Sequence, residues 1–142
     1  MFIKQLSIFV ENRPGAVLEI TDVLEKYHIN LRALSIAETA DYGVVRIIVN
    51  KRDQAIEVLK DAGFLVTITP VIAVAVGDVP GGLRTVLHAL CEAGIHIEYA
   101  NAFVAPIGDS ATILLRCSEM DRSVKLLEEA GFRVLTRAEI GC

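Results

Sequence analysis

The chain has 142 residues, of which 53% are hydrophobic, and its formal net charge is -4 at pH 7. This length fits one ordinary domain or two very small ones, and it buries enough surface to fold without disulfides or metals. The acidic balance and the scattered Lys and Arg residues disfavour nucleic acid as a partner. No apolar run approaches the roughly 18 residues of a membrane span, and the amino terminus lacks a signal-peptide pattern. We therefore expect a cytoplasmic protein with no membrane partner.

The first half of the chain alternates between strand-like and helix-like patterns. Strand-like segments are rich in β-branched residues, whereas helix-like segments repeat apolar residues at three- and four-residue steps. Proline suits the first turn of a helix, and Gly63 is expected to end the second helix. The segment "ADYG" at 40–43 predicts a hairpin turn between two strands. In chain order we expect a strand at 3–10, a helix after Pro14-Gly15, strands at 29–38 and 44–50, a helix at 52–62 and a strand at 64–69.

The second half of the chain repeats this order. A shift of 66 residues places Pro14-Gly15 on Pro80-Gly81, and a shift of 68 later places 62–64 on 130–132. The two extra residues are expected between Phe103 and Ser110, where "PIGD" supplies turn chemistry. In this half we expect elements at 71–77, 81–93, 95–105, 110–117, 121–130 and 132–137.

Two tandem domains, 1–69 and 70–142, are therefore predicted, with almost no linker between them. The order β-α-β-β-α-β gives an antiparallel sheet with both helices on one face, so the predicted fold class is α+β, two tandem ferredoxin-like units. The strands are apolar on both faces, as Val45 and Ile47 alternate with Val44 and Ile48. The face without helices then needs cover from the sister copy or from another chain, and we expect a homodimer.

The Pro-Gly corner before each first helix is the candidate binding feature. The first N–H groups of a helix have no partner within the helix, and they attract a carboxylate. Gly15 allows close approach to the backbone, and Asn12 and Asn30 can each donate and accept hydrogen bonds. Such a set suits a free amino acid. An alternative stays open, in which Pro-Gly only sets the entry angle of the helix and Asn12 only caps it.

The segment "ENRPGAVLEITDVLEKYHINL" resembles the opening of an ACT domain, a small βαββαβ module that regulates amino-acid metabolism. The resemblance is close to the serine-binding regulatory domain of phosphoglycerate dehydrogenases, and it covers the whole chain as two tandem copies. It implies that Asn12 and Asn30 hold the effector in a pocket between domains. Val10 stands where the family has a polar residue, which favours a ligand less polar than serine.

The second corner departs from the family pattern. Asp78 replaces the first Asn and His96 the second, while the Pro-Gly pair remains. Because Asp78 would repel a carboxylate but can hold an ammonium group, the second corner is either a differently oriented site or only a structural partner. We favour the corner of the first copy as the better site. The predicted ligand-binding residues are Asn12, Arg13, Pro14, Gly15, Ala16, Val17, Asn30, Leu31, Asp78, Gly81, Gly82, Leu83 and His96.

Three classes of function remain. We expect a regulatory protein that binds a free amino acid, and the alternative is a non-catalytic subunit that docks onto a biosynthetic enzyme without binding a ligand. An enzyme is disfavoured because no nucleophile, base and orienting group form a known signature. No metal or cofactor is expected, since the cysteines and histidines lack ligand spacing and are read as reduced thiols and ordinary side chains. These residues are His28, His88, His96, Cys91, Cys117 and Cys142.

Overall fold

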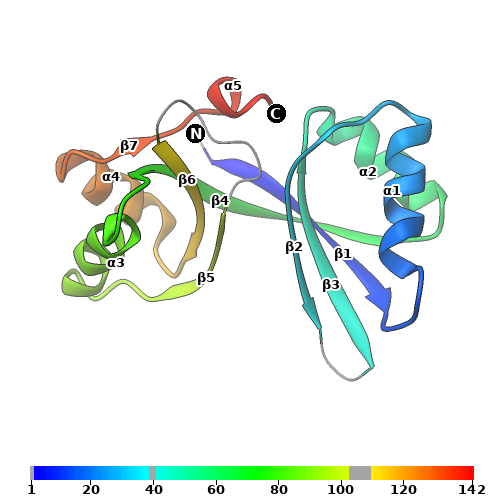
Figure 1. Cartoon of the computed structure of the whole chain (residues 1–142), viewed down its shortest axis with the longest axis horizontal. Helices are drawn as coiled ribbons and strands as arrows, with labels where there is room; N and C mark the ends of the chain where they lie inside the picture. The colour runs from blue at the N-terminus through cyan, green and yellow to red at the C-terminus, as the bar shows by residue number, and fades with distance from the viewer. Residues whose placement is uncertain (1, 39–40, 103–109) are drawn as a thin grey trace. The chain divides into compact units, whose positions relative to one another are not determined.

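In a computed structural model, which describes residues 2–38, 41–102 and 110–142, the chain forms two compact units (Figure 1). The first unit is Lys4–Thr69 with Gly141–Cys142, and the second is Pro70–Ile140 with the residues preceding Lys4. Within the described ranges, no helix is both long and apolar enough to cross a membrane.

The first unit has the predicted βαββαβ order. Its strands lie in the order β2-β3-β1-β4, and the β1–β3 and β2–β3 ladders are antiparallel. The sequence prediction of a ferredoxin-like arrangement is confirmed here. The elements are β1 (Ile3–Glu11), α1 (Ala16–Lys26), β2 (Leu31–Glu38), β3 (Tyr42–Val49), α2 (Arg52–Asp61) and the first part of β4 (Leu65–Gly77).

The core of the first unit lies between the sheet and its two helices. Leu6 pairs in register with Ile47, and Ile8 pairs with Val45. These four side chains are fully buried, in one cluster with residues of both helices such as Ile20. Burying one such side chain stabilises the fold by about 1.5–3 kcal/mol. The alternate residues of β1 therefore face the side of the sheet that lacks helices.

The second unit repeats this architecture. Its strands lie in the order β5-β6-β4-β7, with antiparallel ladders throughout. Val86 and Leu90 of its first helix and Leu127 of its second are buried against the strands. The elements are the second part of β4, α3 (Gly82–Glu92), β5 (Ile97–Ala102), β6 (Ser110–Cys117), α4 (Met120–Glu129), β7 (Arg133–Val134) and α5 (Arg137–Ile140).

Two strand predictions are wrong. β4 runs without a break through Pro70, where the sequence predicts separate strands at 64–69 and 71–77. Proline keeps an extended backbone and only removes one N–H donor, so it is tolerated where β4 passes from one unit to the other. The strand predicted at 132–137 is only the two-residue β7, and the unpredicted helix α5 follows it.

The turn predictions have mixed outcomes. The turn predicted at 40–43 is wrong for Tyr42 and Gly43, which belong to β3, and residue 40 lies outside the described residues. The predicted "PIGD" turn at 106–109 lies outside the described residues, as does the end of the strand predicted at 95–105. Gly63 has a φ of 93° and follows the last turn of α2, as predicted.

Candidate functional site

The first Pro-Gly corner leaves two helix donors available. Gly15 caps α1 in the left-handed conformation, with φ 84°. The Ala16 N–H donates to the Arg13 carbonyl at 3.3 Å, and the Glu19 N–H donates to the Gly15 carbonyl at 3.0 Å. Between them, the N–H groups of residues 17 and 18 meet no acceptor in the part of the chain that the structure describes. Such a pair of donors at a helix N-terminus can bind an anion.

Asn12 connects this corner to the next strand of the sheet. Its backbone N–H donates to the Asp41 carbonyl at 3.2 Å, one residue before β3 begins. Asn12 is exposed to solvent. Its side chain is therefore placed at the corner by the backbone, and a ligand at the surface can reach it.

Arg13 is held by an acidic residue of α1 that the sequence analysis did not nominate. Its guanidinium donates two hydrogen bonds to the Glu19 carboxylate, at 3.0 and 2.7 Å, and lies 3.7 Å from Glu11. The hydrogen bond between the side chains, assisted by their charges, lowers the pKa of Glu19 and raises that of Arg13. A carboxylate ligand at Arg13 has to compete with Glu19.

The second corner has the same backbone geometry. Gly81 caps α3 with φ 84°, the Gly82 N–H donates to the Val79 carbonyl at 3.0 Å, and the Thr85 N–H donates to the Gly81 carbonyl at 3.2 Å. Asp78 is exposed beside it. The repeated corner is thus a repeated backbone structure, although the side chains around it differ.

Asn30 and His96 lie beyond the opposite ends of the same helices. The Asn30 N–H donates to the Asn50 Oδ1 at 3.0 Å, and the His96 N–H donates to the Ser118 Oγ at 3.1 Å. Because α1 has 11 residues, it is about 16 Å long. Asn12 and Asn30 of one unit therefore cannot contact the same small ligand.

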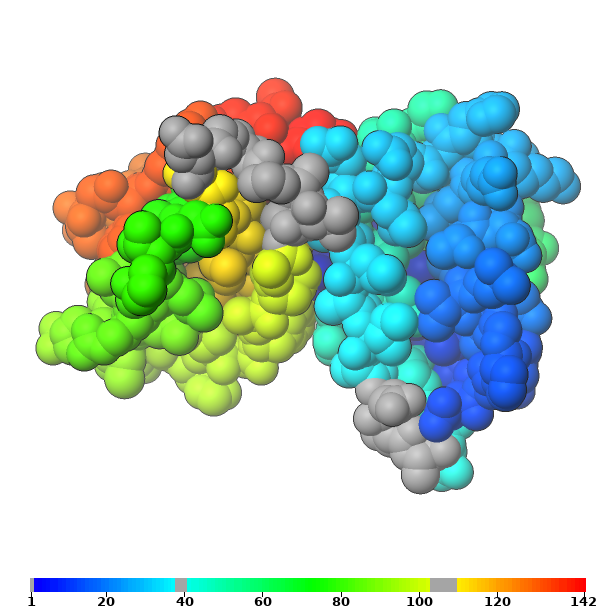
Figure 2. Space-filling model, in the orientation of Figure 1, coloured from blue at the N-terminus to red at the C-terminus, as the bar shows by residue number. Residues whose placement is uncertain are grey.

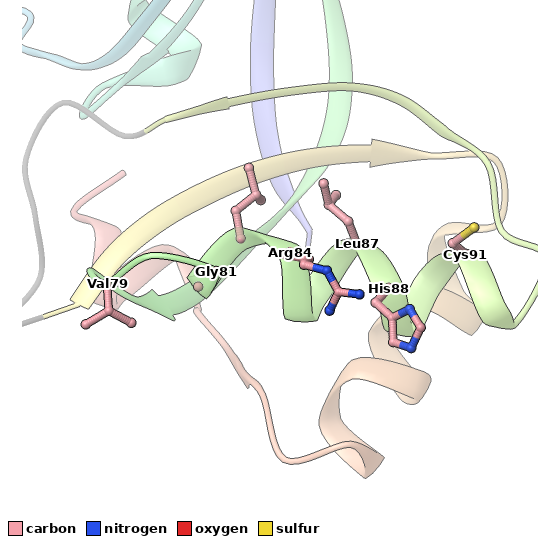
Figure 3. Close-up of a pocket in the computed structure, with 8 residues that line it drawn as sticks. Val79, Gly81, Arg84, Leu87, His88 and Cys91 are labelled. Carbon is pink, nitrogen blue, oxygen red and sulfur yellow. The ribbon is translucent and has the colours of Figure 1, made fainter.

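Six of the predicted site residues line three separate hollows. Gly81, Gly82 and Leu83 line a groove along α3, of about 580 Å³ (Figure 3). Asn30 and Leu31 line a second hollow beside the C-terminal end of α1. Arg13 is in a third, whose other lining residues are Phe9, Val10, Glu11, Tyr42, Gly63, Phe64 and Leu65.

The aromatic lining of the Arg13 hollow was missed by the sequence analysis. Phe9 is opposite Val44 in the β1–β3 ladder, and Tyr42 is opposite Glu11. Phe9 and Tyr42 are 37% and 51% exposed. Phe9 and Tyr42 occupy the positions that alternate with the core residues of β1 and β3. This alternation was the signal in the sequence that could have found them. The result is an apolar surface beside a charged side chain.

Comparison with known proteins identifies one family model and several similar structures. A model described as "ACT domain pair" matches residues 1–136. The crystal structure of protein BT0572 from Bacteroides thetaiotaomicron has 42% sequence identity and a TM-score of 0.92, over 99% of this chain and 96% of that chain. No curated protein matches the chain.

More distant structures share the fold alone. The regulatory subunit of aspartate kinase from Thermus thermophilus, in a ligand-free form, has 15% identity and a TM-score of 0.66, over 89% of this chain and 91% of that chain. The regulatory subunit of aspartate kinase from Thermus flavus has 14% identity and a TM-score of 0.63, over the same shares of the two chains.

Proposed function

The chain belongs to the family of ACT domain pairs, and from this we propose that it is a non-catalytic regulatory protein that binds a free amino acid at its Pro-Gly corners. The observation that carries the proposal is the pair of N–H groups without acceptors at the start of α1, next to the exposed Asn12. The N–H groups suit the carboxylate of an amino acid and the amide oxygen of Asn12 suits its ammonium group.

We also propose that each ACT module corresponds to one half of the chain, 1–69 and 70–142, and that the protein is a cytoplasmic homodimer. A dimer is supported by the distance between Asn12 and Asn30, because a ligand that contacts both side chains needs modules from different copies. The first corner is the favoured site, since Asp78 of the second corner repels a carboxylate.

A second candidate function is a subunit that docks onto a biosynthetic enzyme without a ligand. It is supported by the apolar side chains on the helix-free side of the first unit. Phe9, Tyr42 and Leu65 are 37%, 51% and 65% exposed, and they gather in one hollow. An aspartate kinase regulatory subunit with the same fold provides a precedent for that type of partner.

A thermal-shift screen of the twenty amino acids separates the two candidates. A small ligand of about ten heavy atoms binds in the micromolar to millimolar range. At ten times its Kd, such a ligand stabilises the folded protein by about 1.4 kcal/mol, which raises Tm by a few degrees. A shift with one amino acid or a related group supports the sensor. A uniform absence of shifts, together with retention of a larger enzyme from the native host on the immobilised protein, supports the docking subunit.

A further inference from the structure

Aromatic side chains gather at one end of the first unit, on the side of the sheet that lacks helices. Phe9 and Tyr42 both line the hollow that also contains Arg13. They are diagonal neighbours in the β1–β3 ladder, at a separation of about 7–8 Å that aromatic side chains can bridge. The end of β1 and the start of β3 lie side by side at the surface of this unit (Figure 1 and Figure 2). Because both rings are partly exposed, a ligand can reach them from solvent.

Glu11 brings a carboxylate to the same side of the sheet. It is directly opposite Tyr42 in the ladder, so the Cβ atoms of the two residues are about 5 Å apart. It follows Phe9 by two residues, which places both side chains on one face of β1. The Glu11 side chain is 84% exposed, and the residue lines the same hollow. A carboxylate and two aromatic rings therefore meet in this part of the surface.

The neighbouring guanidinium does not neutralise this carboxylate. Arg13 donates two hydrogen bonds to Glu19, and its Nε is 3.7 Å from the Glu11 carboxylate, beyond hydrogen-bond distance. One guanidinium thus serves two carboxylates, and the three groups together have one excess negative charge.

The charged groups around the hollow leave this sign unchanged. The exposed Asp41 immediately precedes Tyr42 and adds negative charge. Arg46, the basic residue of β3, is four residues after Tyr42 and so about 13 Å away along the strand. Lys60 and Asp61, at the end of α2, are adjacent and opposite in charge. The hollow is therefore anionic as well as apolar.

The second copy keeps the backbone of this region without its chemistry. The ladder position that pairs Glu11 with Tyr42 in the first unit pairs Gly77 with Ser110 in the second. Two residues before Gly77, an alanine stands where the first copy has phenylalanine. The fold of a unit thus needs neither the carboxylate nor the rings at these positions, and in the first unit they are available for binding.

We infer that this hollow binds a small organic cation, a primary amine attached to an aromatic or other bulky apolar group. The apolar group of the ligand packs against Phe9, Tyr42 and Leu65. Its ammonium group lies between the Glu11 carboxylate and the face of the Tyr42 ring. Aromatic rings attract cations at their faces, and the carboxylate accepts a charge-assisted hydrogen bond.

The size and position of the hollow suit such a ligand. Its volume of about 530 Å³ is within the usual range of small-molecule sites, and it holds a ring with a short side chain. All of its lining residues belong to the first unit, so the site is complete without a second module or a second copy of the chain.

The charge of the hollow also determines what it rejects. A ligand with a carboxylate places that group near Glu11 and Glu19, and like charges are unfavourable. A free amino acid is therefore a weaker ligand here than the corresponding amine. The helix N-terminus has the opposite preference, because its N–H groups attract a carboxylate. The inference goes beyond the amino-acid site proposed above and does not depend on it.

Titration calorimetry at neutral pH with 2-phenylethylamine tests the inference. A ligand of about nine heavy atoms at an open site is expected to bind with a Kd of about 0.1–1 mM. The neutral probe 2-phenylethanol has the same shape with a hydroxyl in place of the ammonium group. It is expected to bind about tenfold more weakly, because it lacks the attraction to the carboxylate and to the ring face.

Three variants locate the amine in the hollow. Glu11→Gln keeps the size of the side chain but removes its charge, and it is expected to raise the Kd of the amine about tenfold. Tyr42→Leu removes the ring and is also expected to weaken binding, whereas Tyr42→Phe keeps the ring face and binds as the wild type does. Glu57→Gln, an exposed change on α2, is the matched control and leaves the Kd unaltered.

The possible results separate this inference from the amino-acid site. No binding of the amine up to about 10 mM, equal Kd values for amine and alcohol, or a wild-type Kd in Glu11→Gln overturns the inference. Amine binding that is lost in Asn12→Ala and kept in Glu11→Gln places the probe at the corner and overturns it as well. An amino acid whose binding depends on Asn12 and not on Glu11 supports the corner site whatever the amine does.

Discussion

Gly82 lies so close to the Gly77 carbonyl that a Cβ on Gly82 would be 2.1 Å from the carbonyl oxygen. The equivalent residue of the first copy is Ala16, which starts α1 with its Cβ in place. The second corner is therefore the tighter one, and only glycine fits there. A ligand that approaches it meets a backbone already in contact with the end of β4.

This contact predicts different costs for two glycine-to-alanine changes. In Gly15→Ala the new Cβ has open space, and the cost is that of the left-handed backbone, about 1–2 kcal/mol. In Gly82→Ala the backbone itself has to move, so a larger loss of unfolding free energy is expected. Urea denaturation of both variants measures the difference. An equal loss in the two variants would contradict the tighter second corner.

Removing Arg13 is expected to raise the pKa of Glu19. Glu19 titrates below its usual range because Arg13 donates hydrogen bonds to its carboxylate. The stabilisation from a lowered carboxyl pKa is present above the unfolded-state pKa and is lost as pH falls through the folded-state pKa. Arg13→Gln should therefore reduce the part of the unfolding free energy that the wild type loses as pH falls through the pKa of Glu19. NMR titration of the Glu19 carboxyl checks the pKa directly, and Lys125→Gln, which removes an exposed charge of the other unit, should leave that pKa unchanged.

The hydrogen bond between the Asn30 N–H and the Asn50 side chain, just before β2, is expected to contribute modestly to the stability of the first unit. Asn50→Ala removes the acceptor of the Asn30 N–H, and because this pair is exposed, water partly replaces it. A loss of about 0.5–1 kcal/mol in the unfolding free energy is expected. Asn50→Asp keeps an acceptor and should lose less. If both variants unfold at the same urea concentration as the wild type, the hydrogen bond does not stabilise the unit.

The order of the elements was predictable because burial is periodic. Leu6 and Ile8 alternate along β1, and Ile20 and Leu24 recur at helical spacing in α1, so both patterns point to one core. The end of the second copy was not predictable in this way, because hydrogen bonds decide it. The Glu139 carboxylate accepts from the Thr136 N–H at 3.1 Å, and this local capping starts α5 where the apolar pattern suggests more strand.

The candidate site was predictable in its backbone but not in its side chains. Pro-Gly before an amphipathic pattern led to the two helix N-termini, since both signals are local in the sequence. The pairing of Arg13 with Glu19 joins a residue before α1 to one in its first turn, and it depends on side-chain conformations that composition and spacing do not determine. The separation of Asn12 from Asn30, by contrast, follows from helix length alone.

Substitution of Asn12 tests the proposed head-group contact in a ligand-binding assay. If its side chain bonds the charged head group of an amino acid, Asn12→Ala is expected to cost about 1.5–3 kcal/mol, which corresponds to a Kd about 10- to 100-fold higher. The backbone bond from residue 12 to the Asp41 carbonyl is kept, so the fold of the corner should persist. Titration calorimetry with the amino acid found by thermal shift measures the change, and Gln54→Ala, an exposed change on α2, is the control. An unchanged Kd in Asn12→Ala would remove Asn12 from the site and leave the helix N–H groups as the remaining candidate contacts.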